Sequence, residues 1–124
     1  MLPEDFDKLV DEALEGLPGF FKEKIDNVSV VVEDYPAPAV LRGFEPPRPG
    51  KFDLLGVYIG VPVTERPAHP MAGKQPDRIE LYQKNIESCC RNDREIVEQV
   101  RATVVHEVGH YFGLDEEALR ELGT

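Results

Sequence analysis

The spacing of apolar residues predicts two helices near the N-terminus. Apolar side chains recur every three or four positions from about residue 4 to residue 15, which is the spacing of one buried helix face. Pro18 and Gly19 end this pattern, because proline and glycine both interrupt helices. A short second helix is expected over residues 20–25.

A longer helix is predicted near the C-terminus, from about residue 94 to residue 112. Asn92 or Asp93 can cap its first turn, and Gly113 ends it. The C-terminal half of this helix is apolar around most of its circumference, which indicates a central, buried helix. Asp115 can cap a last short helix that runs to about residue 122.

The segment between these helices predicts short strands separated by loops. Nine of the eleven prolines lie between Pro36 and Pro76, and proline excludes long helices there. We expect surface loops over 35–52 and 61–76, and strands over residues 28–33, 53–60 and 78–83. The predicted fold is a single α+β domain over residues 1–124, with a small mixed sheet of three or four strands packed against the N-terminal helices and the central helix.

Charge and composition narrow the expected partners. The 124 residues carry a net charge of −10. Nucleic acids and anionic membranes attract proteins with clustered lysine and arginine, so this charge argues against binding to either. No apolar run approaches the length of a membrane span, and the acidic N-terminus does not resemble a secretion signal. Cys89 and Cys90 are adjacent and are expected to be reduced thiols. We therefore expect a cytoplasmic protein that binds neither nucleic acid nor membrane.

The central helix carries a pattern that favours metal binding. His106 and His110 are one turn apart, about 40° from each other around the helix, so both imidazoles can reach one ion. Glu107 follows the first histidine and can take a proton from a metal-bound water.

A third protein ligand would leave a fourth position of a tetrahedral zinc ion open for water. Gly113 allows a turn that reverses the chain, and Glu116 follows three residues later. Asp115 is the alternative third ligand, although its position also suits a helix cap. Zn²⁺ is the expected cofactor, and the sequence leaves other divalent ions open.

The extended pattern His106-Glu107-x-x-His110-x-x-Gly113-x-x-Glu116 resembles the motif of the zincin metallopeptidases, with an acid in place of the third histidine of the metzincins. Residues 31–34, 60–66 and 104–114 are similar to segments of a small bacterial group, the minimal zincins or zincin-like metallopeptidases. The resemblance covers about residues 4–122.

This resemblance implies a zinc metallopeptidase with a minimal zincin-like fold. It implies that His106, His110 and Glu116 bind the metal and that Glu107 is the general base. Both methionines, Met1 and Met71, precede the motif, so the methionine turn of the metzincins is not expected.

Other polar residues have more than one interpretation. His69 is expected at the surface of a proline-rich loop. Cys89 and Cys90 are an alternative source of a thiolate ligand, as in the peptide deformylases. Tyr111 either packs in the helix or offers its hydroxyl to a substrate oxyanion. Residues 64–66 either flank a strand that pairs with a peptide substrate or form an ordinary turn.

Three functions compete on this evidence. The leading hypothesis is a peptidase that acts on peptides or flexible protein segments. A metal-dependent endoribonuclease is the first alternative, because one bacterial RNA-maturation family has a similar spacing and an aspartate where Asp115 stands. Glu107, Glu116 and the net negative charge argue against it. The second alternative is a zinc-binding module without catalysis, because few residues follow the motif to wall a cleft.

Overall fold

The computed structural model describes residues 1–60 and 77–121 of the chain. The elements follow in the order α1 (Pro3–Glu15), α2 (Gly19–Ile25), β1 (Ser29–Glu33), α3 (Pro38–Arg42), β2 (Gly56–Ile59), β3 (Arg78–Tyr82), α4 (Gln83–Ser88), α5 (Asp93–Tyr111) and α6 (Glu116–Glu121). The prediction of an α+β fold with a small mixed sheet is confirmed. Within the described ranges, no helix is both long and apolar enough to cross a membrane.

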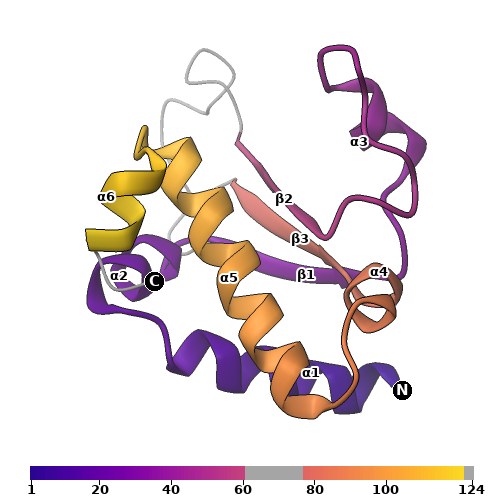
Figure 1. Ribbon diagram of the computed structural model, residues 1–124, viewed down its shortest axis with the longest axis horizontal. Helices are drawn as coiled ribbons and strands as arrows, with labels where there is room; N and C mark the ends of the chain where they lie inside the picture. Colours follow the sequence, from indigo (N-terminus) through magenta and orange to yellow (C-terminus); the bar gives the residue numbers. More distant parts are fainter. Residues whose placement is uncertain (61–76, 122–124) are drawn as a thin grey trace.

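The sheet has the order β1-β3-β2, which places β3 in the centre and β2 at an edge (Figure 1). β1 runs parallel to β3 and β2 runs antiparallel to it. Successive side chains of a strand point to opposite faces. Ile79 and Leu81 of β3 therefore share one face and are fully buried in the core.

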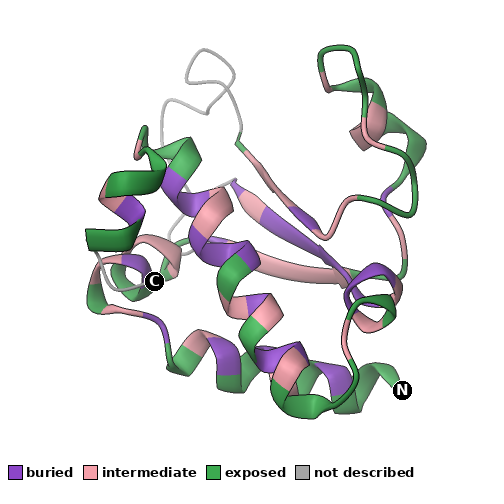
Figure 2. Ribbon diagram, in the orientation of Figure 1, coloured by how far each residue is buried: buried purple, intermediate pink, exposed green. Residues whose placement is uncertain are grey.

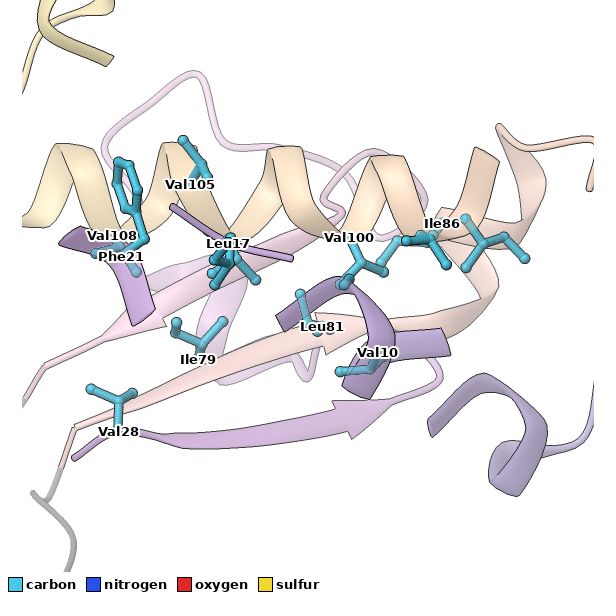
Figure 3. Close-up of a cluster of buried hydrophobic side chains, with 14 of the residues drawn as sticks. Val10, Leu17, Phe21, Val28, Ile79, Leu81, Ile86, Val100, Val105 and Val108 are labelled. Carbon is cyan, nitrogen blue, oxygen red and sulfur yellow. The ribbon is translucent and has the colours of Figure 1, made fainter. Parts of the chain in front are cut away.

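The core lies between this face of the sheet and the helices α1, α2 and α5. α5 crosses in front of the sheet, and α1 packs against α5 (Figure 1). Figure 3 shows side chains from α1, β3 and α5, among them Val10, Leu81 and Val100, in one cluster. Figure 2 shows that α5 alternates between buried and exposed positions along its length, so it has an inward and an outward side.

The other face of β3 carries a row of polar groups. Glu80 accepts hydrogen bonds from the Arg78 Nε–H and from the Tyr82 hydroxyl, each at 2.8 Å. Burial of Tyr82, together with its hydrogen bond to Glu80, raises the pKa of the phenol well above its ordinary value. These bonds satisfy a carboxylate that is only 9% exposed.

The segment that precedes β2 is held by a buried side chain of α4. The Asn85 amide donates two hydrogen bonds of 2.8 Å, to the carbonyl oxygens of Lys51 and Leu54. Asn85 is only 2% exposed, so both bonds are shielded from water. This anchor fixes the start of β2, the strand that borders the candidate site.

Two short helices differ from the sequence-based expectations. The prediction of an irregular loop over residues 35–52 is wrong over residues 38–42, where α3 forms. Pro38 is tolerated there because it stands in the first turn, where a backbone N–H would have no partner within the helix. Gln83, expected to end a strand, instead begins α4 after the extended residue Tyr82. The strand expected over 53–60 is shorter, and the loop expected over 61–76 lies outside the described residues.

Candidate metal centre

α5 begins where the sequence places it. The Asn92 side chain accepts a hydrogen bond of 2.9 Å from the Glu95 backbone N–H, and Glu95 in turn accepts one of 2.9 Å from the Arg91 N–H. The two bonds satisfy the backbone N–H of Glu95 in the first turn and that of Arg91, the residue before the cap. The helix then continues without interruption to Tyr111, so His106, Glu107 and His110 lie in its last turns.

A tight turn follows α5 and returns the chain toward the histidines. Gly113 has a φ of +81°, a left-handed conformation that residues with a side chain rarely adopt. The N–H of Leu114 bonds the carbonyl of Gly109 at 2.8 Å, and the N–H of Gly113 bonds that of His110 at 3.0 Å. The glycine required by the extended motif thus closes the helix and redirects the chain.

Close packing between α5 and α6 depends on a second glycine. A Cβ atom on Gly109 would overlap the side chain of Leu119, which is buried at the base of α6. Gly109 therefore lets α6, which begins at Glu116, lie close against the C-terminal end of α5 (Figure 1).

Glu116 bridges the two histidines. Its Oε2 lies 3.3 Å from the Nε2 of His106 and its Oε1 lies 3.3 Å from the Nε2 of His110. The neighbouring Asp115 instead caps α6, because its Oδ1 accepts a hydrogen bond of 2.8 Å from the Ala118 N–H. Of the two acids proposed as third ligand, Glu116 is the one placed against both imidazoles.

The hydrogen bond of His106 to the backbone favours one tautomer of its ring. Nδ1 lies 2.9 Å from the carbonyl oxygen of Ala102, one turn earlier, so Nδ1 carries the proton in this arrangement. In the neutral ring Nε2 is then an acceptor, and it faces a carboxylate oxygen that is also an acceptor. A cation between them, either a proton or a metal ion, removes this repulsion.

The donor types at this cluster are ones that zinc commonly binds. Two imidazole nitrogens and one carboxylate are common zinc ligands, and ligands at about 2.0–2.1 Å from a tetrahedral ion lie about 3.3 Å from one another. In the described residues, however, no group of three or more His, Cys, Asp or Glu side chains encloses a point suited to a metal ion as it stands. The imidazole centroids are 6.0 Å apart, and each Glu116 oxygen contacts a different ring. Because the Glu116 side chain is 62% exposed, packing does not prevent its adjustment.

Glu107 links this cluster to the edge of the sheet. Its Oε1 accepts a hydrogen bond of 3.0 Å from the backbone N–H of Tyr58 in β2. The close approach of β2 to α5 requires Gly56, because a Cβ there would lie 2.8 Å from Thr103 Cγ2 and 2.9 Å from the Glu80 carbonyl oxygen. The catalytic candidate therefore stands between the histidines and a strand edge.

A small cleft opens beside His106 and Glu107. It has a volume of about 290 Å³ and is lined by the start of β2 and by the turn of α5 that precedes the histidines, including Leu55, Gln99 and Thr103. A larger hollow of about 810 Å³ lies at the end of β1 and is not lined by either histidine. We take the smaller cleft as the relevant one, because it borders the groups that can do chemistry.

The remaining candidates take separate places. The Tyr111 ring packs against the Tyr58 ring with 4.0 Å between centroids, as its helical position indicated. Cys89 and Cys90 precede α5, whereas His106 lies about 20 Å further along it at 1.5 Å per residue. They do not join the histidines as ligands, so that alternative is wrong. His69 and residues 64–66 lie outside the described residues.

Comparison with known proteins places this arrangement in a family. The profile of the zincin-like metallopeptidase family matches residues 25–124. The chain belongs to this family. The zincin-like match includes the whole sheet and α5 and α6, and thus β2, α5 and α6, the elements that form the site.

Two further comparisons add little about function. A conserved hypothetical protein from Thermo thermophilus has a similar structure, with 26% sequence identity and a TM-score of 0.49 over 97% of this chain and 98% of that one. No curated protein matches the chain.

Three residues of the site were missed by the sequence interpretation. Tyr58 contributes a backbone N–H, which leaves no side-chain signature in a sequence. Ala102 contributes a backbone carbonyl, and only its position four residues before His106 could have indicated this. Gly109 leaves room for the side chain of Leu119 in α6. The presence of a glycine inside an otherwise regular helix could have indicated such close packing.

Proposed function

We propose that this protein is a zinc-dependent metallopeptidase that hydrolyses peptide bonds in peptides or flexible protein segments. The observation that carries this proposal is the contact of Glu116 with both His106 and His110, with Glu107 beside them at the edge of β2. Membership of the zincin-like metallopeptidase family supports the same activity.

His106, His110 and Glu116 would hold the zinc ion, which would polarise the scissile carbonyl and lower the pKa of a bound water. Glu107 would act as general base, taking a proton from the attacking water and later giving one to the departing amine. The Ala102 carbonyl would hold the His106 ring with its Nε2 lone pair directed at the centre.

The outer edge of β2 would position the substrate. An extended peptide can add to a strand edge through backbone hydrogen bonds. The Tyr58 N–H, which now bonds Glu107, is one donor at that edge. If a substrate carbonyl accepted the hydrogen bond from this N–H instead, the Glu107 carboxylate would be free to take a proton from the water.

The Glu107→Gln variant tests the mechanism. Glutamine keeps the size of the side chain and an oxygen for the Tyr58 N–H, but it removes the base. We expect full zinc occupancy and a loss of kcat/KM of about 100-fold or more, measured on a peptide library. Glu98→Gln, on an exposed part of α5, is the matched control and should keep wild-type activity.

Hydrolysis that survives in zinc-loaded Glu107→Gln would eliminate Glu107 as the base. Wild-type protein that binds zinc but cleaves no peptide would instead favour the non-catalytic zinc module.

A further inference from the structure

The face of the sheet that is turned away from the core carries a second group of apolar side chains. Val57 pairs with Glu80 and Ile59 pairs with Arg78 across β2 and β3, so these four side chains share that face. Half-buried apolar side chains from α3, the residues after it and β2 line a hollow of about 480 Å³ here, namely Val40, Phe44, Val57 and Ile59. Within the described residues, none of these four belongs to the core or packs against it.

The wall of the hollow that α3 provides is held by hydrogen bonds of the main chain. The Gly43 N–H donates to the Val40 carbonyl at 3.1 Å, and the Phe44 N–H donates to the Leu41 carbonyl at 3.3 Å. The Arg48 Nε–H then donates to the Phe44 carbonyl at 2.9 Å. These bonds fix the backbone that carries Val40 and Phe44, so the hollow is formed before any ligand arrives.

The charge at the hollow is compensated within the chain. Among the described residues that line it, only Arg78 is charged. Its Nε lies 2.8 Å from the Oε2 of Glu80, which is only 9% exposed. A charged side chain placed among the apolar walls would lose hydration without gaining an uncompensated opposite charge. The lining therefore favours an apolar occupant.

β2 connects this hollow with the candidate metal centre. The Tyr58 N–H donates to Glu107, and the Tyr58 ring packs against Tyr111 on the side of α5. Because side chains alternate along a strand, Val57 and Ile59 point the other way, into the hollow. One short strand thus presents its backbone to the candidate base and its alternate side chains to the hollow.

An extended peptide that adds to the edge of β2 follows the same alternation. The peptide residue opposite Tyr58 directs its side chain toward α5, and the residues before and after it direct theirs toward the side of the hollow. Neighbouring strands lie only about 4.7–4.9 Å apart, so a long side chain on the peptide can reach across β2.

We propose that the hollow between α3 and β2 is a specificity subsite that accepts one large apolar side chain, such as that of leucine or phenylalanine, next to the peptide residue that pairs with Tyr58. Its volume lies within the range of about 300–1,000 Å³ that is usual for ligand pockets. The inference rests on the proposed peptidase function, because that function supplies the extended peptide. It adds the class of substrate, a peptide segment with a large apolar residue at one defined position.

Peptide binding and peptide cleavage are measured separately, so that the subsite and the peptidase activity can fail independently. Zinc-loaded Glu107→Gln protein is titrated with short fluorescent peptides in which each position in turn carries leucine, phenylalanine, glycine or lysine. Wild-type protein is assayed for cleavage of the same set. We expect leucine or phenylalanine at one position to bind at least about 10-fold more tightly than glycine or lysine there. The same preference should appear in kcat/KM.

Val40→Phe fills the hollow and should remove this preference, while the affinity for zinc and for the glycine peptides remains. Leu41→Phe is the matched control, because Leu41 is the next residue of α3 and lines the separate hollow at the end of β1. It should keep the preference. Val57→Thr is nearly isosteric but adds a hydroxyl to the wall, and it should weaken the preference even if Val40→Phe does not fold. Circular dichroism confirms the fold of each variant.

Binding with the expected preference but without cleavage would support the subsite and overturn the peptidase proposal. Cleavage or binding that shows no preference for a large apolar residue at any position would overturn the subsite and leave the peptidase proposal intact. A preference that survives unchanged in folded Val40→Phe or in Val57→Thr would also overturn the subsite. Absence of both binding and cleavage would overturn both proposals.

Discussion

Both halves of α5 pack apolar side chains into the core, and the C-terminal half in addition presents two histidines to solvent. Ile96, Val97 and Val100 are at most 7% exposed. The side chains of His106 and His110 are 45% and 54% exposed. One continuous helix thus has an N-terminal part that only stabilises the fold and a C-terminal part that also carries the groups able to do chemistry.

The polar groups at the two ends are also satisfied differently. At the N-terminal end, the Asn92 cap and the pairs of Arg91 with Glu95 and of Arg94 with Glu98 are complete within the chain. At the C-terminal end, the imidazoles of His106 and His110 both face the exposed carboxylate of Glu116, each at 3.3 Å. The partial negative charge of a helix C-terminus also favours a cation there. The difference teaches that the functional end is the one where two imidazoles and a carboxylate converge.

The largest effect on stability is expected from Ile96→Ala. Removing this buried side chain should lower the free energy of unfolding by about 3 kcal/mol, because it leaves a cavity between α5 and the rest of the core. Zinc affinity of the folded protein should not change. Chemical denaturation measures the stability and a zinc titration measures the affinity. A loss of zinc affinity in the folded variant would contradict the view that the N-terminal part of α5 stabilises the fold without contributing to the metal centre.

Gly109→Ala should have a smaller effect on stability but should also impair the metal centre. The new methyl group would overlap Leu119, at a cost of about 1–3 kcal/mol, and the better helix propensity of alanine returns only about 1 kcal/mol. We expect α6 to move away from α5 and zinc affinity to fall. The control is Gly19→Ala, because a Cβ at Gly19 meets no atom within 4 Å. Equal zinc affinity in both variants would remove the proposed role of Gly109.

Asn92→Ala should have the smallest effect. Loss of its hydrogen bond to the Glu95 N–H should lower the free energy of unfolding by about 1 kcal/mol without altering zinc binding. Asn92→Ser keeps a capping oxygen and should restore most of the stability. Thermal and chemical denaturation of the two variants provide the comparison, and identical stabilities would show that the cap is unimportant.

Much of this architecture was predictable because it depends on local pattern. The caps at Asn92 and Asp115, the limits of α5 and the turn at Gly113 follow from residue preferences within a few positions. The convergence of the histidines with Glu116 followed from motif spacing.

The parts that were missed depend on tertiary contacts or on very short elements. α3 has five residues and α4 has six, too few for a periodic pattern to emerge. The bond between Glu107 and the Tyr58 N–H joins residues 49 positions apart, and the spacing of the motif contains no information about it.

Zinc titration of two matched variants tests the central claim most directly. Glu116→Gln and Asp115→Asn each replace a carboxylate with an amide, at adjacent positions of the same turn. We predict that Glu116→Gln lowers zinc affinity by at least about 100-fold. Asp115→Asn should leave the affinity nearly unchanged, because asparagine also caps helices. Wild-type protein that binds no zinc, or a loss of zinc binding in Asp115→Asn but not in Glu116→Gln, would contradict the account.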